Sequence, residues 1–227
     1  MINQWKSSNL TNLFNLYDDH IEREILYPKL AKLIDKEYSD SRILDFGCGT
    51  GKFMEYICHD RELNITGCDI SEEALNLAKK RLQDKVLVNI DDDLIKLNNT
   101  TFDLVFCNFL FITYHKKSLI KKDMSLISNF LLHGSKLVVS DFNPYSVGID
   151  FKTFMAGEKY HKYMNGDNIT CKMKTITGKE FEFVDYFWNV ETIIDIAASM
   201  GLNKVNEEYI MMKNDAASPF YILEFIK

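Results

Sequence analysis

The chain has 227 residues, of which 46% are hydrophobic and 26% charged, a composition typical of a globular protein and unlike disordered, collagen-like or coiled-coil chains. The formal net charge is −6 and no run of lysine or arginine exceeds a pair, which disfavours a long nucleic acid as partner. Because no segment approaches the roughly 18 consecutive apolar residues of a membrane span and the N-terminus carries no apolar signal core, we expect a cytoplasmic protein without a membrane partner.

Residues 10–38 carry an apolar stripe at helical spacing and are expected to be helical, with a break near residues 18–19. Short apolar runs then alternate with helical patterns. Strands are expected at residues 42–46, 64–68, 86–90, 102–107 and 135–141, and helices at 52–59, 72–82 and 116–131. Strand–helix alternation with short loops is typical of βαβ units and predicts an α/β fold whose parallel sheet is covered on both faces.

The alternation stops after Asp141. The next segment, residues 142–188, is expected to hold a helix at 149–163 and a hairpin with arms at 170–176 and 180–186. A helix at 190–200 and two antiparallel strands, at 203–212 and 219–226, complete the chain. The five cysteines are odd in number and have no C-x-x-C spacing, so they indicate neither a disulfide framework nor a zinc site.

A glycine-rich run, Asp45-Phe46-Gly47-Cys48-Gly49-Thr50-Gly51, ends the first strand and opens a helix. Glycines in such a turn let a ligand approach the backbone closely. Asp69 ends the next strand about 20 residues later, where a carboxylate can accept hydrogen bonds from ribose hydroxyls. Lysine at position 52 separates this spacing from the G-x-G-x-x-G fingerprint of dinucleotide-binding proteins.

The run resembles motif I of the class I S-adenosylmethionine-dependent methyltransferases, and segments up to residue 141 resemble the later motifs of that family in order. The resemblance implies S-adenosylmethionine as cofactor and a three-layer Rossmann-like sandwich, with a mostly parallel seven-stranded sheet, an antiparallel last strand and a helix/hairpin lid. In the family an acid in the third motif accepts a hydrogen bond from the adenine amino group, and Asp92 matches it best. The cofactor-binding residues implied in this way are Asp45, Gly47, Cys48, Gly49, Gly51, Asp69, Ile70, Asp92, Asp93, Cys107, Asn108 and Phe109.

The residues after the fourth and fifth strands bear on the acceptor of the methyl group. Asn108 is followed by Phe-Leu-Phe, not by the Pro-Pro-Tyr/Phe of enzymes that methylate amino groups of nucleic-acid bases. Phe142 separates Asp141 from Asn143, unlike the adjacent Asp-Asn of the metal-dependent catechol-type branch, so we expect no metal. The resemblance therefore indicates methyl transfer to nitrogen or oxygen of a small-molecule metabolite, by in-line displacement that depends mainly on positioning. The alternatives are an RNA or protein methyltransferase of the same fold, an NAD(P)-binding oxidoreductase, or a non-catalytic binding subunit.

Substrate contacts are expected from two regions of a single methyltransferase domain spanning residues 1–227: an N-terminal helical cap at 1–40 and a substrate lid at 142–188. The lid holds 11 of the 29 aromatic residues of the chain. The expected substrate-binding residues are Tyr17, Phe111, Tyr145, Phe154, Tyr186 and Trp188. Catalytic candidates are His115, because histidine titrates near neutral pH, and Tyr17, which lies in a run similar to the Phe-x-x-Tyr-Asp of small-molecule members. We expect a monomer or homodimer.

Overall fold

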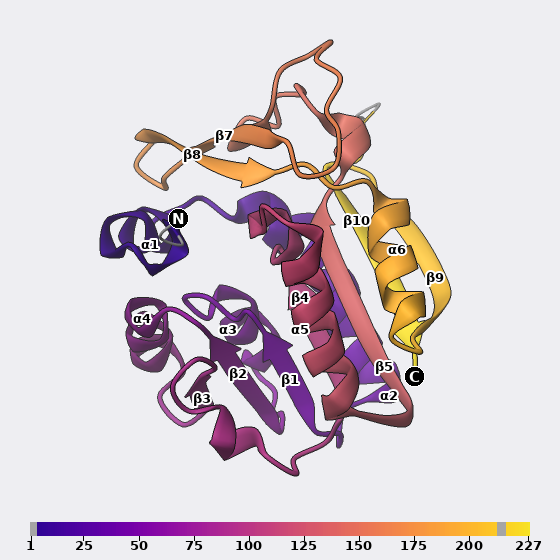
Figure 1. Ribbon diagram of the computed structural model, residues 1–227. Helices are drawn as coiled ribbons and strands as arrows, with labels where there is room; N and C mark the ends of the chain where they lie inside the picture. Colours follow the sequence, from indigo (N-terminus) through magenta and orange to yellow (C-terminus); the bar gives the residue numbers. More distant parts are fainter. Residues whose placement is uncertain (1–3, 213–216) are drawn as a thin grey trace.

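The computed structural model describes residues 4–212 and 217–227, and its central feature is a twisted seven-stranded sheet (Figure 1). In spatial order the strands are β3 (Val86–Asn89), β2 (Ile65–Asp69), β1 (Ile43–Phe46), β4 (Phe102–Asn108), β5 (Leu131–Phe142), β10 (Phe220–Ile226) and β9 (Asn203–Ile210). The first five strands in this order run parallel, whereas β10 is antiparallel to both β5 and β9. The predicted mostly parallel seven-stranded sheet with an antiparallel last strand is confirmed.

Alternate residues of each strand face opposite helical layers, which makes the central strands apolar on both faces. In β1, Leu44 and Phe46 pack in one core cluster with residues of α5 and α6, while Ile43 packs in another with residues of α2 and α3. The α-helices that flank the sheet are α2 (Tyr27–Glu37), α3 (Lys52–Cys58), α4 (Glu72–Leu82), α5 (Lys117–Phe130) and α6 (Val190–Ser199). Short helical turns lie at η1 (Gln4–Lys6), η2 (Glu22–Leu26), η3 (Leu94–Leu97), η4 (Phe111–Thr113) and η5 (Pro144–Ser146).

The N-terminal segment forms two helical stretches, because a short extended piece between them pairs with the lid. After α1 (Ser8–Asn15) the chain leaves the helix, and Tyr17 forms an antiparallel bridge with Thr175. The backbone N–H of Asp18 donates to the carbonyl of Lys174 at 2.9 Å. A π-helical turn then leads into α2. The break expected near residues 18–19 is therefore present, and it joins the N-terminal segment to the lid.

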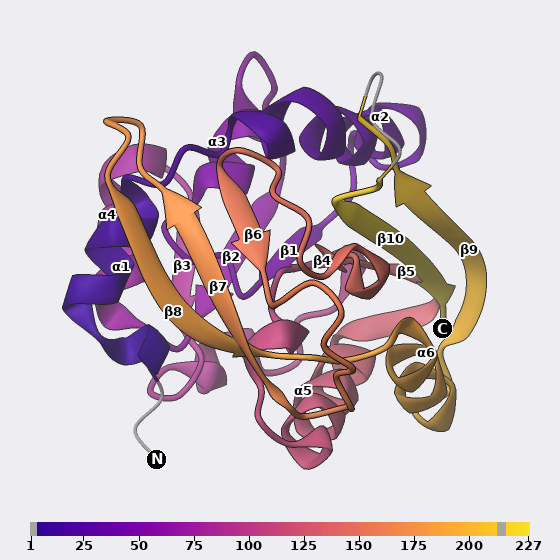
Figure 2. The ribbon, with the colours of Figure 1, turned by 90° about the horizontal axis from the view of Figure 1, so that it is seen from above.

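Residues 143–188 place a second, three-stranded antiparallel sheet over the carboxyl ends of the central strands (Figures 1 and 2). Its strands are β6 (Phe154–Ala156), β7 (Asn168–Lys174) and β8 (Glu180–Tyr186), so the hairpin is confirmed. The prediction of a helix at residues 149–163 is wrong. Lys152, Gly157 and Tyr160 adopt positive φ angles of 72°, 71° and 72°, which end any helix, and β6 pairs with β7 instead.

All five cysteines are free thiols, and four of them are buried. Among the described residues, no helix has an apolar stretch long enough to cross a bilayer.

Candidate active site

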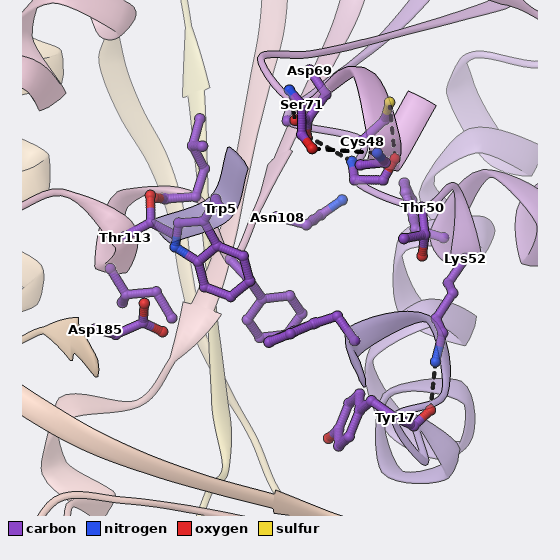
Figure 3. A pocket seen from close by; sticks show the side chains of 18 of the residues that line it. Trp5, Tyr17, Cys48, Thr50, Lys52, Asp69, Ser71, Asn108, Thr113 and Asp185 are labelled. Atoms are coloured by element: carbon purple, nitrogen blue, oxygen red, sulfur yellow. Dashed lines mark hydrogen bonds between the residues drawn. The ribbon is translucent and has the colours of Figure 1, made fainter. Parts of the chain in front are cut away.

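A largely apolar cavity of about 240 Å³ lies at the carboxyl ends of β1, β2 and β4, beneath the second sheet. Ligands of open α/β sheets bind at this edge, where loops from successive strands converge. Four parts of the chain line the cavity: the glycine-rich loop, the ends of β2 and β4, the N-terminal segment and the lid. Figure 3 shows Asp69 and Cys48 on one wall, Lys52 and Tyr17 on another, and Asp185 beside Thr113 on the side away from Lys52.

The glycine-rich loop exposes its backbone to the cavity. Gly47 and Gly49 adopt φ angles of 85° and 53°, in the left-handed region that glycine tolerates. No atom lies within 4 Å of where a Cβ of Gly49 would stand, so a ligand can reach this peptide. Gly51 serves packing instead, because a Cβ there would lie 2.9 Å from Cδ1 of Leu82 in α4.

Asp69 is fixed by the same loop. Its Oδ2 accepts a hydrogen bond from the N–H of Gly49 at 2.9 Å, and its Oδ1 accepts one from the N–H of Ser71 at 2.8 Å. Burial raises the pKa of Asp69, while these amides oppose the rise. Each carboxylate oxygen keeps a further lone pair, so Asp69 can still accept hydrogen bonds from a ligand.

Asp45 and Asn108 present buried polar atoms without hydrogen-bond partners. Oδ1 of Asp45 has none within hydrogen-bond distance, and neither has Nδ2 of Asn108, whose Oδ1 accepts from Oγ of Ser140 at 2.6 Å. Burial and the nearby Asp69 raise the pKa of Asp45 to about 7, and the Asn108 amide only partly opposes this. Asp45 and Asn108 thus place a carboxyl and an amide close together on one wall, with hydrogen-bonding capacity left for a ligand that carries both kinds of polar group.

The N-terminal wall is built around Tyr17 and Glu22. The Tyr17 hydroxyl donates to Oε1 of Glu22 at 2.8 Å, and Oε2 of Glu22 is buried without a partner. Burial raises the pKa of Glu22 to about 7. Lys52 is the one lysine or arginine that lines the cavity within the described residues, and its Nζ donates to the carbonyl of Tyr17 and lies 3.5 Å from Oδ1 of Asp19.

The structure brings most of the expected site residues together. Those that line the cavity are Tyr17, Asp45, Gly47, Cys48, Gly49, Asp69, Ile70, Asn108, Phe109 and Phe154. Cys107 and Phe111 are buried in the core beneath the cavity. Asp92 and Asp93, from the third motif, do not line the cavity, whereas Ile90 of the same segment does.

The remaining expected residues lie away from this cavity. His115 and Tyr186 line a neighbouring groove, with their rings 5.8 Å apart. Trp188 donates its indole N–H to the carbonyl of Tyr114 at 2.8 Å, which ties the end of the lid to the segment after β4. Tyr145 is 65% exposed, and its hydroxyl donates to Glu191. His115 is therefore not among the residues that line the cavity, although Ile70 and Tyr114 line both the cavity and the groove.

Five charged residues at the cavity were not among the site residues expected from the sequence: Asp19, Glu22, Lys52, Asp123 and Asp185. The burial of Asp185 could have been predicted from the sequence, because β8 alternates polar and apolar residues and Asp185 occupies a position on the apolar, inward face. The positions of Glu22 and Lys52 at the cavity could not have been predicted in this way, since they depend on contacts between separate elements. No three His, Cys, Asp or Glu side chains in the described ranges are arranged to hold a metal ion.

Comparison with known proteins adds to this geometry. Residues 43–132 match the family model described as a methyltransferase domain. N-demethylindolmycin N-methyltransferase of Streptomyces griseus is 25% identical over 191 residues, which cover 81% of this chain and 80% of that protein. Residues 43–132 thus form a methyltransferase domain, and the protein is an S-adenosylmethionine-dependent methyltransferase. This confirms the resemblance seen in the sequence and sets aside the NAD(P)-binding alternative.

Solved structures agree with the fold of this methyltransferase. An S-adenosylmethionine-dependent methyltransferase from Clostridium acetobutylicum superposes with a TM-score of 0.64 at 19% identity, covering 96% of this chain and 98% of its own. Magnesium protoporphyrin IX methyltransferase from Synechocystis, crystallised with bound S-adenosylmethionine, gives a TM-score of 0.58 at 16% identity over 88% of this chain and 77% of its own. The cofactor of the methyltransferase is S-adenosylmethionine.

Proposed function

We propose that this methyltransferase transfers the methyl group to a nitrogen or oxygen atom of a small molecule with an apolar body. The observation that carries the proposal is one cavity, largely apolar, whose walls include both the glycine-rich loop and the aromatic residues of the lid. The relative from Streptomyces griseus acts, by its name, on a small molecule. The acidic net charge further disfavours RNA as the acceptor.

The residues at the loop fit the cofactor. Asp45 and Asn108 place a carboxyl and an amide close together at the loop, which suits the ammonium and carboxylate of an amino acid. We infer that this end lies against Gly47, Cys48 and Gly49, which line the cavity, with open space at Gly49. Asp69 would accept hydrogen bonds from the ribose hydroxyls, and Ile70 would pack against the adenine ring.

S-adenosylmethionine supplies a methyl group made electrophilic by its sulfonium. The protein's part is to hold the accepting atom close to and in line with that group, which makes an intermolecular step effectively intramolecular. Phe154 of the lid and Tyr17 of the N-terminal segment enclose the cavity and exclude water. Glu22 lines the cavity and His115 lines the neighbouring groove, so Glu22 is better placed than His115 to exchange a proton with a substrate there.

A labelling experiment tests the acceptor class. The enzyme is incubated with methyl-labelled S-adenosylmethionine and extracts separated into small-molecule, protein and RNA fractions. We expect label in an organic-soluble small molecule. Label confined to the acid-precipitable protein or RNA fraction contradicts the proposal, and a Gly49→Val enzyme, in which the open loop is filled, serves as the inactive control.

A further inference from the structure

Asp185 occupies a position where the strand pattern calls for an apolar side chain. In β8 the outward residues Glu180 and Glu182 are exposed and lie 3.3 and 3.2 Å from Lys174 and Lys172 across the hairpin. The inward residues Phe181 and Phe183 are buried in the contact with α1. Asp185 continues this inward row, is only 2% exposed and lines the cavity. A carboxyl on the buried face of a lid is costly to desolvate.

No strong partner among the described residues compensates that cost. Oδ1 of Asp185 has no hydrogen-bond partner, and Oδ2 meets only the weak thiol donor of Cys171, at 3.9 Å. No lysine, arginine or histidine of the described chain pairs with it. Burial and then the nearby Asp141 raise the pKa of Asp185 well above its usual range. Buried carboxyls without partners are concentrated at binding sites, where a ligand completes them.

Three other carboxyls of the cavity have strong partners. Asp69 accepts two backbone N–H groups, Asp123 accepts the hydroxyl of Tyr114, and Asp19 is paired with Arg23 at 3.0 Å. Glu22 and Asp45 each keep one unpaired oxygen as well, but Glu22 lies on the N-terminal wall and Asp45 at the glycine-rich loop, whereas Asp185 lies on the lid. Asp185 lies on the lid, beside Thr113 and on the side of the cavity away from Lys52, so the lysine does not neutralise it (Figure 3).

We propose that Asp185 binds a protonated amino group of the acceptor, so that the substrates of this methyltransferase are amines with an apolar body. The inference rests on the proposed function and names its substrate class. The apolar body would pack against Phe154, Met173 and Phe220, which line the same space. An anionic acceptor would meet an unpaired carboxyl there and is disfavoured.

The test uses the enzyme saturated with S-adenosylhomocysteine and two probes of one skeleton, 2-phenylethylamine and 2-phenylethanol, measured by isothermal titration calorimetry. We expect the amine to bind at least about tenfold more tightly than the alcohol, because hydrogen bonds to charged groups contribute more than neutral ones. Asp185→Asn should abolish that preference. The matched control Glu182→Gln, on the outward face of the same strand, should keep it.

The outcomes separate the two proposals. Equal binding of amine and alcohol by the wild-type enzyme, no amine binding at about 1 mM, or an amine preference that survives in Asp185→Asn would each overturn the role of Asp185. Failure to bind S-adenosylhomocysteine would instead count against the cofactor site. Asp185→Asn should bind S-adenosylhomocysteine normally and should raise the melting temperature of the ligand-free protein, whereas a purely structural carboxyl would lower it.

Discussion

The pH dependence of stability tests the buried carboxyl beside Tyr17 directly. The substitution is Glu22→Gln, which keeps an acceptor for the Tyr17 hydroxyl and removes the titrating group. Burial raises the pKa of Glu22 from 4.5 to about 7. Below pH 4.5 the carboxyl is protonated in both states and its contribution to folding is complete. As the pH rises to about 7, the unfolded chain ionises first, so that contribution is lost.

The size of the effect follows from the two pKa values. A group with a pKa of 4.5 unfolded and about 7 folded loses about 3 kcal/mol of stabilisation across that range. Urea unfolding of the ligand-free protein at a series of pH values measures it. We expect Glu22→Gln to gain about 3 kcal/mol relative to wild type between pH 4.5 and 7.5. The exposed Glu24, substituted in the same way, should give a curve parallel to wild type. Parallel curves for Glu22→Gln would refute the buried, proton-binding carboxyl.

Three further predictions concern the loop. Asp69→Ala should weaken S-adenosylhomocysteine binding by about 1–3 kcal/mol, because ribose hydroxyls lose a buried acceptor; unchanged affinity in calorimetry would contradict that role. Gly51→Ala should lower stability by about 1–3 kcal/mol in thermal unfolding, since it combines a positive φ with a 2.9 Å clash, and Gly178→Ala, with a positive φ but open space, should cost less. Cofactor binding near pH 6.5 should release a proton from Asp45, whose pKa is about 7 in the free protein; titration in buffers of different ionisation enthalpy detects it, and identical heats would argue against it.

The sheet and the cofactor loop were predictable because their signals are local. Each central strand is a short apolar run between turn residues, and the spacing from Asp45 to Gly51 is set within seven consecutive residues. Both depend on neighbours in the sequence, so periodicity and glycine positions are sufficient to find them.

The first part of the lid and the N-terminal wall of the cavity could not be predicted in this way, because they depend on pairing between distant segments. The helix expected at 149–163 is replaced by β6, which exists only because β7 lies beside it. Tyr17 is held by Thr175 of the lid hairpin, and this contact positions Glu22 and Lys52 at the cavity. His115 followed the fourth strand as expected, yet the turn at 111–113 carries it to the neighbouring groove.

A crystal structure of the enzyme with S-adenosylhomocysteine is the most direct test of the cofactor site. It should show the ribose hydroxyls at Asp69, the amino-acid end of the ligand at Gly47 and Gly49, and the sulfur facing the space beneath the lid. A ligand bound elsewhere, or bound with its ribose away from Asp69, would contradict the account.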